Sequence, residues 1–151
     1  MFTRVLTDTD AAAFYQIRRR ALDEEAEALG TKPEWMVPAE VLAEWFKTKW
    51  SGQSGFVMGA FDSVLVGIVG LEEDGDSAAK LWGVYVVPER WRHGVGRRLL
   101  LDAVARAREW RDLERLWLDL AATNRPARTL YLSCGFRAIE THGEIMTLDL
   151  R

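Results

Sequence analysis

Short hydrophobic runs, some alternating with polar residues and some continuous, recur along this chain and predict β-strands. The apolar run at residues 81–87, closed by Pro88, predicts a buried central strand. Residues 56–61 and 64–71 predict two strands joined by a tight turn, so three neighbouring antiparallel strands are expected. Further strands are expected at residues 2–6, 116–120, 136–139 and 145–150.

Elsewhere the hydrophobic residues recur every three or four positions, which predicts amphipathic helices. Val95, Leu99 and Ala103 form such an apolar face in the segment that follows the central strand. The other expected helices run from about Thr9 to Gly30, from Pro38 to Lys49 and from Asn124 to Gly135.

The order of these elements predicts the fold class. The strand at 81–87, the helix after it and the strand at 116–120 form a strand–helix–strand unit with parallel pairing. This order therefore predicts that residues 1–151 form a single mixed α/β domain. Its mixed, mostly antiparallel central sheet is expected to have roughly six to seven strands, flanked by about four helices.

The composition excludes several classes of protein. The chain has 151 residues, a hydrophobic fraction of 48% and a net charge of −3, which is typical of a globular domain without a general affinity for nucleic acid. Its one cysteine, Cys134, and its two histidines, His93 and His142, make a metal site unexpected. No run reaches the roughly 18 apolar residues of a membrane span, and the N-terminus lacks a signal-peptide pattern. A cytoplasmic protein that does not bind membranes is therefore expected.

Residues 81–107 have the order strand, glycine-bearing loop and helix, in which backbone amides at the helix N-terminus can receive an anion. Gly94 and Gly96 lie in the loop, and Arg97 and Arg98 follow in the first helical turn. Cations are disfavoured there by about 0.3–1 kcal/mol, because the helix dipole is positive. A bound polyphosphate would reverse this cost, whereas a solvated basic surface is the simpler alternative.

The segment from Val86 into the following helix resembles the acetyl-CoA-binding motif of the GNAT superfamily of N-acyltransferases. That motif has a strand, the pattern Gln/Arg-x-x-Gly-x-Gly/Ala and a helix, and here Trp91 stands at the Gln/Arg position before Gly94 and Gly96. The resemblance implies that amides of this loop hold the pyrophosphate of acetyl-CoA. It also implies that backbone amides of Tyr85 and Val86 bind the thioester carbonyl. The full set of implied cofactor-binding residues is Tyr85, Val86, Val87, Trp91, Arg92, His93, Gly94, Val95, Gly96, Arg97, Asn124 and Tyr131.

A second segment resembles the other GNAT motif, with the pattern Asn124-x-x-Ala127-x-x-Leu130-Tyr131-x-x-x-Gly135-Phe136. The resemblance implies that Tyr131 is a general acid near the CoA sulfur, where a phenol can protonate a departing thiolate. The separation of seven residues places Asn124 and Tyr131 on one helix face. Asn124 is expected to cap the helix, to contact the pantetheine chain, or to do both.

A general base is harder to identify. An amine acceptor with a pKa near ~10 must lose a proton before it attacks. In the family the base is often a glutamate on a central strand, but the strand at 81–87 has no carboxylate. Glu72, at the end of the preceding strand, is the best candidate. The alternative is that residues 72–76 are only a solvated acidic turn and that water takes the proton.

Together the motifs predict an N-acetyltransferase that moves an acetyl group from acetyl-CoA directly to a primary amine of a small molecule or peptide. Transfer is expected in a ternary complex, without a metal. Residues 14–50, which carry aromatic side chains and no motif, are expected to form the acceptor pocket. Dimers are common in the family, so a homodimer is an open outcome for this chain.

Two alternative functions are consistent with part of this evidence. The first is a non-catalytic acyl-CoA-binding sensor with the same fold. The second is a dinucleotide-binding domain, in which Gly94 and Gly96 would lie at the pyrophosphate and Asp119 at a ribose. The second is disfavoured because Leu99 stands at the third glycine position and six residues separate Val87 from Gly94.

Overall fold

The computed structural model describes residues 1–29, 37–52, 54–121, 123–139 and 145–151. In this part of the chain, one sheet of seven strands has the order β1-β2-β3-β4-β5-β7-β6. Neighbouring strands pair antiparallel except β4 and β5, which pair parallel as the element order predicts. The strands are β1 (Phe2–Val5), β2 (Gly55–Asp62), β3 (Val64–Glu73), β4 (Ala78–Val86), β5 (Arg115–Asp119), β6 (Arg137–Ala138) and β7 (Ile145–Asp149).

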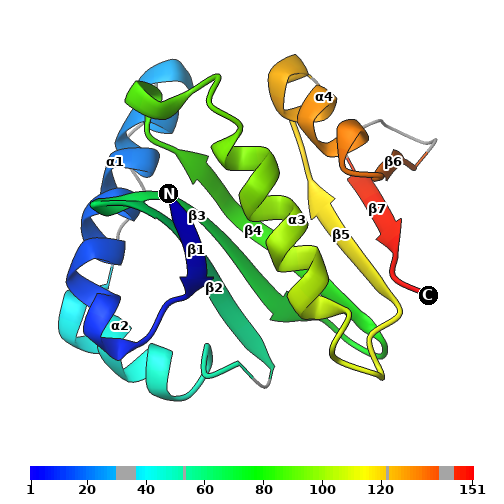
Figure 1. The fold of residues 1–151 in the computed structure, drawn as a ribbon, viewed down its shortest axis with the longest axis horizontal. Helices are drawn as coiled ribbons and strands as arrows, with labels where there is room; N and C mark the ends of the chain where they lie inside the picture. The colour runs from blue at the N-terminus through cyan, green and yellow to red at the C-terminus, as the bar shows by residue number, and fades with distance from the viewer. Residues whose placement is uncertain (30–36, 53, 122, 140–144) are drawn as a thin grey trace.

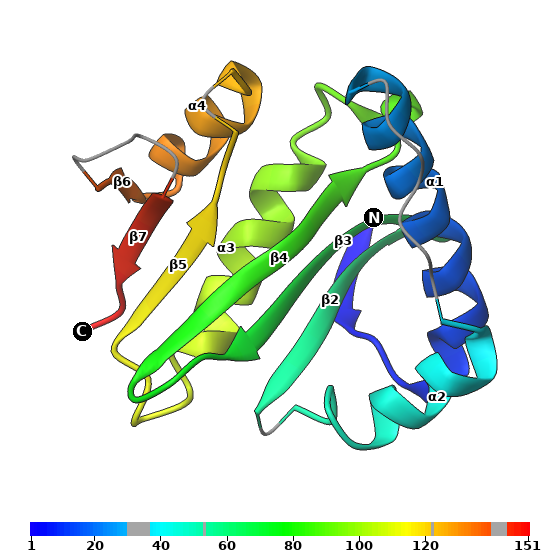
Figure 2. The same cartoon turned by 180° about the vertical axis from the view of Figure 1, so that it is seen from behind.

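The helices lie on both faces of this sheet. The four α-helices described are α1 (Ala11–Leu29), α2 (Ala39–Lys47), α3 (Val95–Ala107) and α4 (Arg125–Ser133), and the short 3-10 helices are η1 (Asp8–Asp10) and η2 (Pro88–Arg90). Figure 1 shows α3 lying across the sheet, where it contacts β2, β3 and β4. Figure 2, from behind, shows β4 in front of α3, with α1 and α2 beside the N-terminal strands. None of the described helices has the length and apolar composition needed to cross a bilayer.

Alternate residues of β3 serve the two faces of the sheet. A Cβ on Gly67 would lie 2.8 Å from Cδ1 of Leu99, so the missing side chain lets α3 pack closely on this strand. Leu99 and Ala103 of α3 are fully buried there, as the helical period predicts. On the other face the ring of Trp82 lies over Gly70, where a Cβ would come within 2.0 Å of Cε2.

The boundaries correct two of the sequence expectations. The second helix begins after Pro38, which is its N-cap rather than part of its first turn. The solvated turn considered for residues 72–76 is wrong for Glu72, because β3 continues through Glu73 and Glu72 pairs with Lys80 on β4. The helix end predicted at Gly30 lies outside the described residues.

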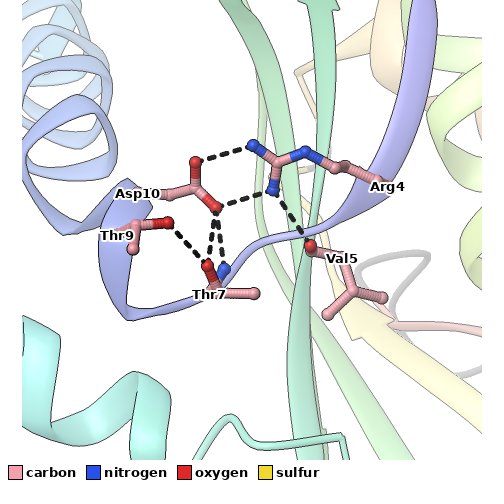
Figure 3. Close-up of polar contacts among 5 residues, drawn as sticks. All are labelled: Arg4, Val5, Thr7, Thr9 and Asp10. Carbon is pink, nitrogen blue, oxygen red and sulfur yellow. Dashed lines mark hydrogen bonds and ion pairs between the residues drawn. The ribbon is translucent and has the colours of Figure 1, made fainter.

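The N-terminal strand is tied to the first helical segment by one buried carboxylate (Figure 3). Asp10 is 8% exposed, and its two oxygens accept hydrogen bonds from Arg4 at 2.7 and 2.8 Å. Its Oδ2 also accepts the backbone N–H of Thr7 at 2.8 Å. These contacts hold the pKa of Asp10 below its usual value, chiefly because the guanidinium of Arg4 donates to the charged form.

Candidate active site

The parallel strands β4 and β5 separate toward their C-terminal ends. Their pairing joins only Ala78–Lys80 to Arg115–Trp117, and beyond Lys80 the two strands diverge (Figures 1 and 2). The N-terminal ends of α3 and α4 lie at this open end of the sheet (Figure 1). We call the region where the two strands diverge, beside the two helix termini that carry the sequence motifs, the β4–β5 gap.

A β-bulge in β4 shapes the edge of this gap. Opposite partners shift from Gly70 and Trp82 to Ile68 and Tyr85, so β4 has one residue more than β3 over this interval. Gly83, inside the bulge, has a φ of +61°, a left-handed conformation that glycine adopts without steric cost. The bulge bends the strand just before the residues expected to bind the cofactor.

The two amides of β4 predicted to bind the thioester carbonyl, those of Tyr85 and Val86, point in opposite directions. The N–H of Val87 donates to the carbonyl of Val66 at 2.9 Å, so it points toward β3. Because backbone groups alternate sides along a strand, the N–H and carbonyl of Val86 point into the gap, whereas those of Tyr85 point back toward β3. Val84 lies in the bulge, where two residues of β4 face one residue of β3 and this alternation is interrupted.

The side chain of Tyr85 belongs to a contact with α1. Its hydroxyl donates a hydrogen bond to Glu24, and burial together with this bond raises its pKa. Arg20, one turn earlier in α1, donates to Glu89 of η2 at 2.9 Å. These contacts tie α1 to the end of β4 and to the loop that leads to α3.

Trp91 places its indole at the gap edge of β4. Its Nε1 donates to the carbonyl of Val86 at 2.8 Å, although the side chain as a whole is 60% exposed. The residue at the Gln/Arg position of the motif therefore contacts the strand through a side-chain hydrogen bond.

The loop before α3 presents backbone amides to the gap end of the sheet. Arg92 has a φ of +67° and Gly94 a φ of +75°, with His93 between them in the ordinary negative region. Such alternation turns successive N–H groups to one side and forms an anion-binding concavity. Gly94 is the N-cap of α3 and supplies no side-chain cap, and the first helical bond runs from the N–H of Arg98 to Gly94. The amides of residues 95–97 are thus the unpaired donors that every helix N-terminus leaves.

Two basic residues around this loop are ion-paired. Arg90 pairs with Asp62 at 3.0 Å, and Arg98, which is itself exposed, pairs with Asp102 at 3.0 Å. Arg92, His93 and Arg97 are exposed as well. These three are the basic side chains that the motif assigns to the cofactor.

Helix α4 brings its motif residues toward the same end of the gap. Asn124 is its N-cap, and its Oδ1 accepts the N–H of Ala127 at 3.2 Å, as expected. A Cβ on Gly96 would lie 3.2 Å from Cδ2 of Leu130 and 3.7 Å from Cγ2 of Val86. The glycine therefore lets α3, α4 and β4 meet closely.

Tyr131, next to Leu130, is buried. It is 7% exposed, and its ring lies 5.8 Å from that of Phe136 between centroids. Burial raises the pKa of Tyr131 to about 12, with a smaller contribution from Cys134. A phenol with this pKa keeps its proton at neutral pH and can donate it.

Glu72 lies on the face of β3 that α1 and α2 approach. Its Oε1 accepts the indole N–H of Trp50 at 2.8 Å and lies 3.9 Å from Nζ of Lys49. Its partner Lys80 precedes Val84 by four residues, and strands rise about 3.3 Å per residue, so Glu72 lies on the order of 10 Å along β4 from Val84. A proton from an amine beside Val84 would need a chain of water molecules to reach this carboxylate.

A hollow of about 340 Å³ lies between the α1–α2 pair and the sheet. It is lined by Phe14, Arg18, Leu22, Val37, Leu42, Trp45, Lys49, Trp50, Glu72 and Trp82. Most of these residues belong to the segment 14–50 expected to form the acceptor pocket. Two other apolar residues of that segment, Trp35 and Met36, lie outside the described residues.

The architecture contradicts the dinucleotide-binding alternative. Such domains need a largely parallel doubly wound sheet, whereas only one pair of strands in the described sheet is parallel. Asp119, the residue that would contact a ribose, is instead ion-paired with Lys80 at 2.8 Å. The described residues contain no group of three or more His, Cys, Asp or Glu side chains arranged for a metal ion.

Comparisons with known proteins agree with this architecture. PaiA N-acetyltransferase from Thermoplasma acidophilum, solved in complex with coenzyme A, is 20% identical with a TM-score of 0.70, and the alignment covers 99% of each chain. The protein yncA from Salmonella typhimurium, solved with its cofactor acetyl-CoA, is 21% identical with a TM-score of 0.78, over 100% of this chain and 94% of that one. Ribosomal-protein-alanine N-acetyltransferase from Brucella melitensis is 22% identical with a TM-score of 0.79, over 99% of each chain.

These likenesses show the fold, and a sequence model identifies the family. No curated protein sequence matches this chain. The model of the acetyltransferase (GNAT) family matches residues 7–136, which is most of the sequence. The chain therefore belongs to the GNAT family of acetyltransferases.

Proposed function

We propose that this protein is an N-acetyltransferase that transfers the acetyl group of acetyl-CoA to a primary amine. The observation that carries the proposal is the β4–β5 gap, which has the outward-facing backbone of Val86 on one side and the uncapped N-terminus of α3 at its end. An extended ligand with amide groups and a polyphosphate matches that combination. The relatives from Thermoplasma acidophilum and Salmonella typhimurium, solved with coenzyme A and acetyl-CoA, support this choice of ligand.

The proposed roles follow from the direction of each group. The amides of residues 95–97 and the exposed Arg92, His93 and Arg97 would hold the pyrophosphate. The N–H of Val86 would donate to the thioester carbonyl as it gains negative charge. When bound, acetyl-CoA supplies an acetyl group activated as a thioester.

The proton transfers are assigned to two side chains. Tyr131 holds its proton at neutral pH and would donate it to the departing sulfur. Glu72 would accept the proton of the amine through a chain of water molecules, because it lies on the order of 10 Å from Val84, too far for direct contact. Trp82 lines the hollow and belongs to β4, the strand that borders the gap, which supports direct transfer between two bound substrates.

Calorimetric titration with acetyl-CoA, with NADH as a parallel control, tests the cofactor. We expect acetyl-CoA to bind with a micromolar Kd and NADH to show no detectable binding. The absence of acetyl-CoA binding would overturn the proposal. Release of free CoA thiol in the presence of a panel of primary amines then distinguishes an enzyme from an acyl-CoA sensor. Intersecting double-reciprocal plots are expected for a ternary complex, whereas parallel plots would indicate a covalent enzyme intermediate.

A further inference from the structure

Two half-buried indoles, those of Trp45 on α2 and Trp82 on β4, line the hollow. Trp50, which is buried, packs against both of them, and its ring centroid lies 5.5 Å from that of Trp45 and 5.2 Å from that of Trp82. Phe14, also buried, lies 5.5 Å from Trp50 between ring centroids. The two half-buried indoles are thus supported by a packed aromatic cluster, so they present fixed ring surfaces to a ligand.

The size of the hollow suits one ring rather than a long chain. Its volume of about 340 Å³ is at the lower end of the ~300–1,000 Å³ typical of small-molecule sites. The other apolar residues in its lining are Leu22, Val37 and Leu42. A single aromatic ring in the hollow would therefore be enclosed by apolar and aromatic side chains.

The charged side chains of the lining already have interactions of their own. Glu72 accepts the indole N–H of Trp50 at 2.8 Å and lies 3.9 Å from Nζ of Lys49. Cζ of Arg18 lies 5.8 Å from the ring centroid of Trp82. In the part of the lining that the structure describes, Glu72 is the one carboxylate, and Lys49 offsets its charge. This lining thus offers no counter-charge for a second ammonium group, which disfavours a polyamine.

We infer that the acceptor is an arylalkylamine, a primary amine joined to one aromatic ring by a short carbon linker, an inference that rests on the proposed function. Its ring lies in the hollow against Trp45 and Trp82. Aromatic rings in offset-stacked or edge-to-face contact gain more than their buried area alone provides. The hollow therefore prefers an aromatic ring to a saturated group of the same size.

The position of Trp82 on β4 brings the amine of such a molecule to the reacting strand. Trp82 precedes Val84 by two residues, which is roughly 7 Å along the strand. A linker of one or two carbons lets the amine approach Val84 while the ring stays at Trp82. Val86, whose N–H is proposed to bind the thioester carbonyl, follows two residues later on the same strand.

The reaction is balanced without a further reactant. The nitrogen of the arylalkylamine forms a bond to the acyl carbon, and the bond between that carbon and the CoA sulfur breaks. One proton leaves the nitrogen, and one proton is taken up by the sulfur. The products are an N-acetyl arylalkylamine and CoA thiol.

A matched substrate series tests the aromatic ring directly. We expect kcat/KM for phenethylamine to exceed that for 2-cyclohexylethylamine by about 3- to 10-fold. It should exceed that for ethylamine and for the diamine putrescine by about 10- to 100-fold, because neither of them buries a ring. All rates are referred to the concentration of unprotonated amine, which removes the differences in basicity between these substrates.

A variant series assigns the preference to the hollow. Trp45→Leu should lower kcat/KM for phenethylamine about 3- to 10-fold and leave that for ethylamine nearly unchanged, whereas Trp45→Phe should keep most of the preference. Trp117→Leu is the matched control, because Trp117 is also half-buried and lies outside the lining of the hollow. Nζ of Lys80 lies 4.8 Å from the ring centroid of Trp117, as Nζ of Lys49 lies 4.7 Å from that of Trp45. A variant that merely misfolds would lose ethylamine as well, and the wild-type series would still decide.

Each outcome decides between two claims. If 2-cyclohexylethylamine or putrescine is acetylated as well as phenethylamine, the inference is wrong and the acetyltransferase proposal stands. The same holds if Trp45→Leu folds and keeps the full wild-type preference. Failure to bind acetyl-CoA, or to release CoA thiol with any amine, would instead overturn the proposed function itself.

Discussion

The indole N–H of Trp91 donates a hydrogen bond to the carbonyl of Val86, with 2.8 Å between Nε1 and the oxygen. That carbonyl points into the β4–β5 gap, so the bond joins the start of the phosphate-binding loop to the open edge of the strand. A loop held in place before binding loses less entropy when the ligand arrives. Trp91, which replaces the Gln or Arg of the motif, thus holds the start of the loop in place by its hydrogen bond to β4.

Trp91→Phe keeps the ring and removes this donor. We expect the Kd for acetyl-CoA to rise about 3- to 10-fold with little change in kcat, which corresponds to one net hydrogen bond. Trp117→Phe is the control, because it removes an indole bond of similar length, 2.9 Å to Asp74, on β5. Tighter binding by Trp91→Phe would instead mean that the indole competes with the ligand for the Val86 carbonyl.

Gly94 is expected to be required for the anion site rather than only for folding. Gly94→Ala and Gly75→Ala form a matched pair, since their φ values are +75° and +74° and neither added Cβ would meet an atom within 4 Å. Both changes should destabilise the fold by about 1 kcal/mol, measured by urea unfolding. Only Gly94→Ala should also weaken acetyl-CoA binding in calorimetry. Equal affinities for the two variants would remove the pyrophosphate from this loop.

Tyr131→Phe removes the proposed general acid and little else. We expect kcat to fall by about 100-fold or more while the Kd for acetyl-CoA stays nearly constant. Because burial raises the pKa of Tyr131 to about 12, its acid form persists and its ionisation should lower the wild-type rate only near that pH. Tyr15→Phe, on α1, serves as the control. Unchanged turnover of Tyr131→Phe would exclude the acid role.

Glu72→Gln tests the base while keeping an oxygen for the bond from Trp50. We expect kcat to fall about 10- to 100-fold and the decline of the rate at low pH to become shallower, since a base works only when deprotonated. Glu73→Gln, at the exposed neighbouring position, should leave the pH–rate profile unchanged. If Glu72→Gln lowers the rate equally at every pH, the residue positions Trp50 and does not transfer the proton.

The Arg4–Asp10 contact should make the free energy of unfolding depend on pH in the acid range. Asp10→Asn should lower the free energy of unfolding by about 1–2 kcal/mol at pH 7, because Arg4 then lacks its charged partner. The folded-state pKa of Asp10 is lowered, so its stabilisation is complete above the unfolded value of about 3.9 and is lost as the pH falls through the folded pKa. The difference between wild type and variant in urea unfolding should therefore shrink at pH 3. Asp8→Asn, in the same turn and outside this cluster, is the control, and its free energy of unfolding at pH 7 should stay close to that of the wild type.

The elements that depend on local pattern could be predicted from the sequence. The apolar spacing of Val95, Leu99 and Ala103 predicted α3, and the same residues are buried against the sheet. Asn124 was predicted as a cap and accepts the N–H of Ala127. Such features rest on helical periodicity and capping within a few neighbouring residues. The motif around Gly94 and Gly96 is local in the same way, and the family that it resembles is confirmed.

Only the tertiary structure decided how these pieces face one another. The strand register with Val66 distinguishes the amide of Val86, which faces the gap, from that of Tyr85, which faces β3. The bulge at Gly83 brings that glycine beside Arg18, 65 residues earlier in the chain, and no periodicity connects the two positions. Register and bulges are set by how whole strands and helices pack, so the amino-acid sequence determined the elements and the motif, and packing determined the gap and the hollow beside it.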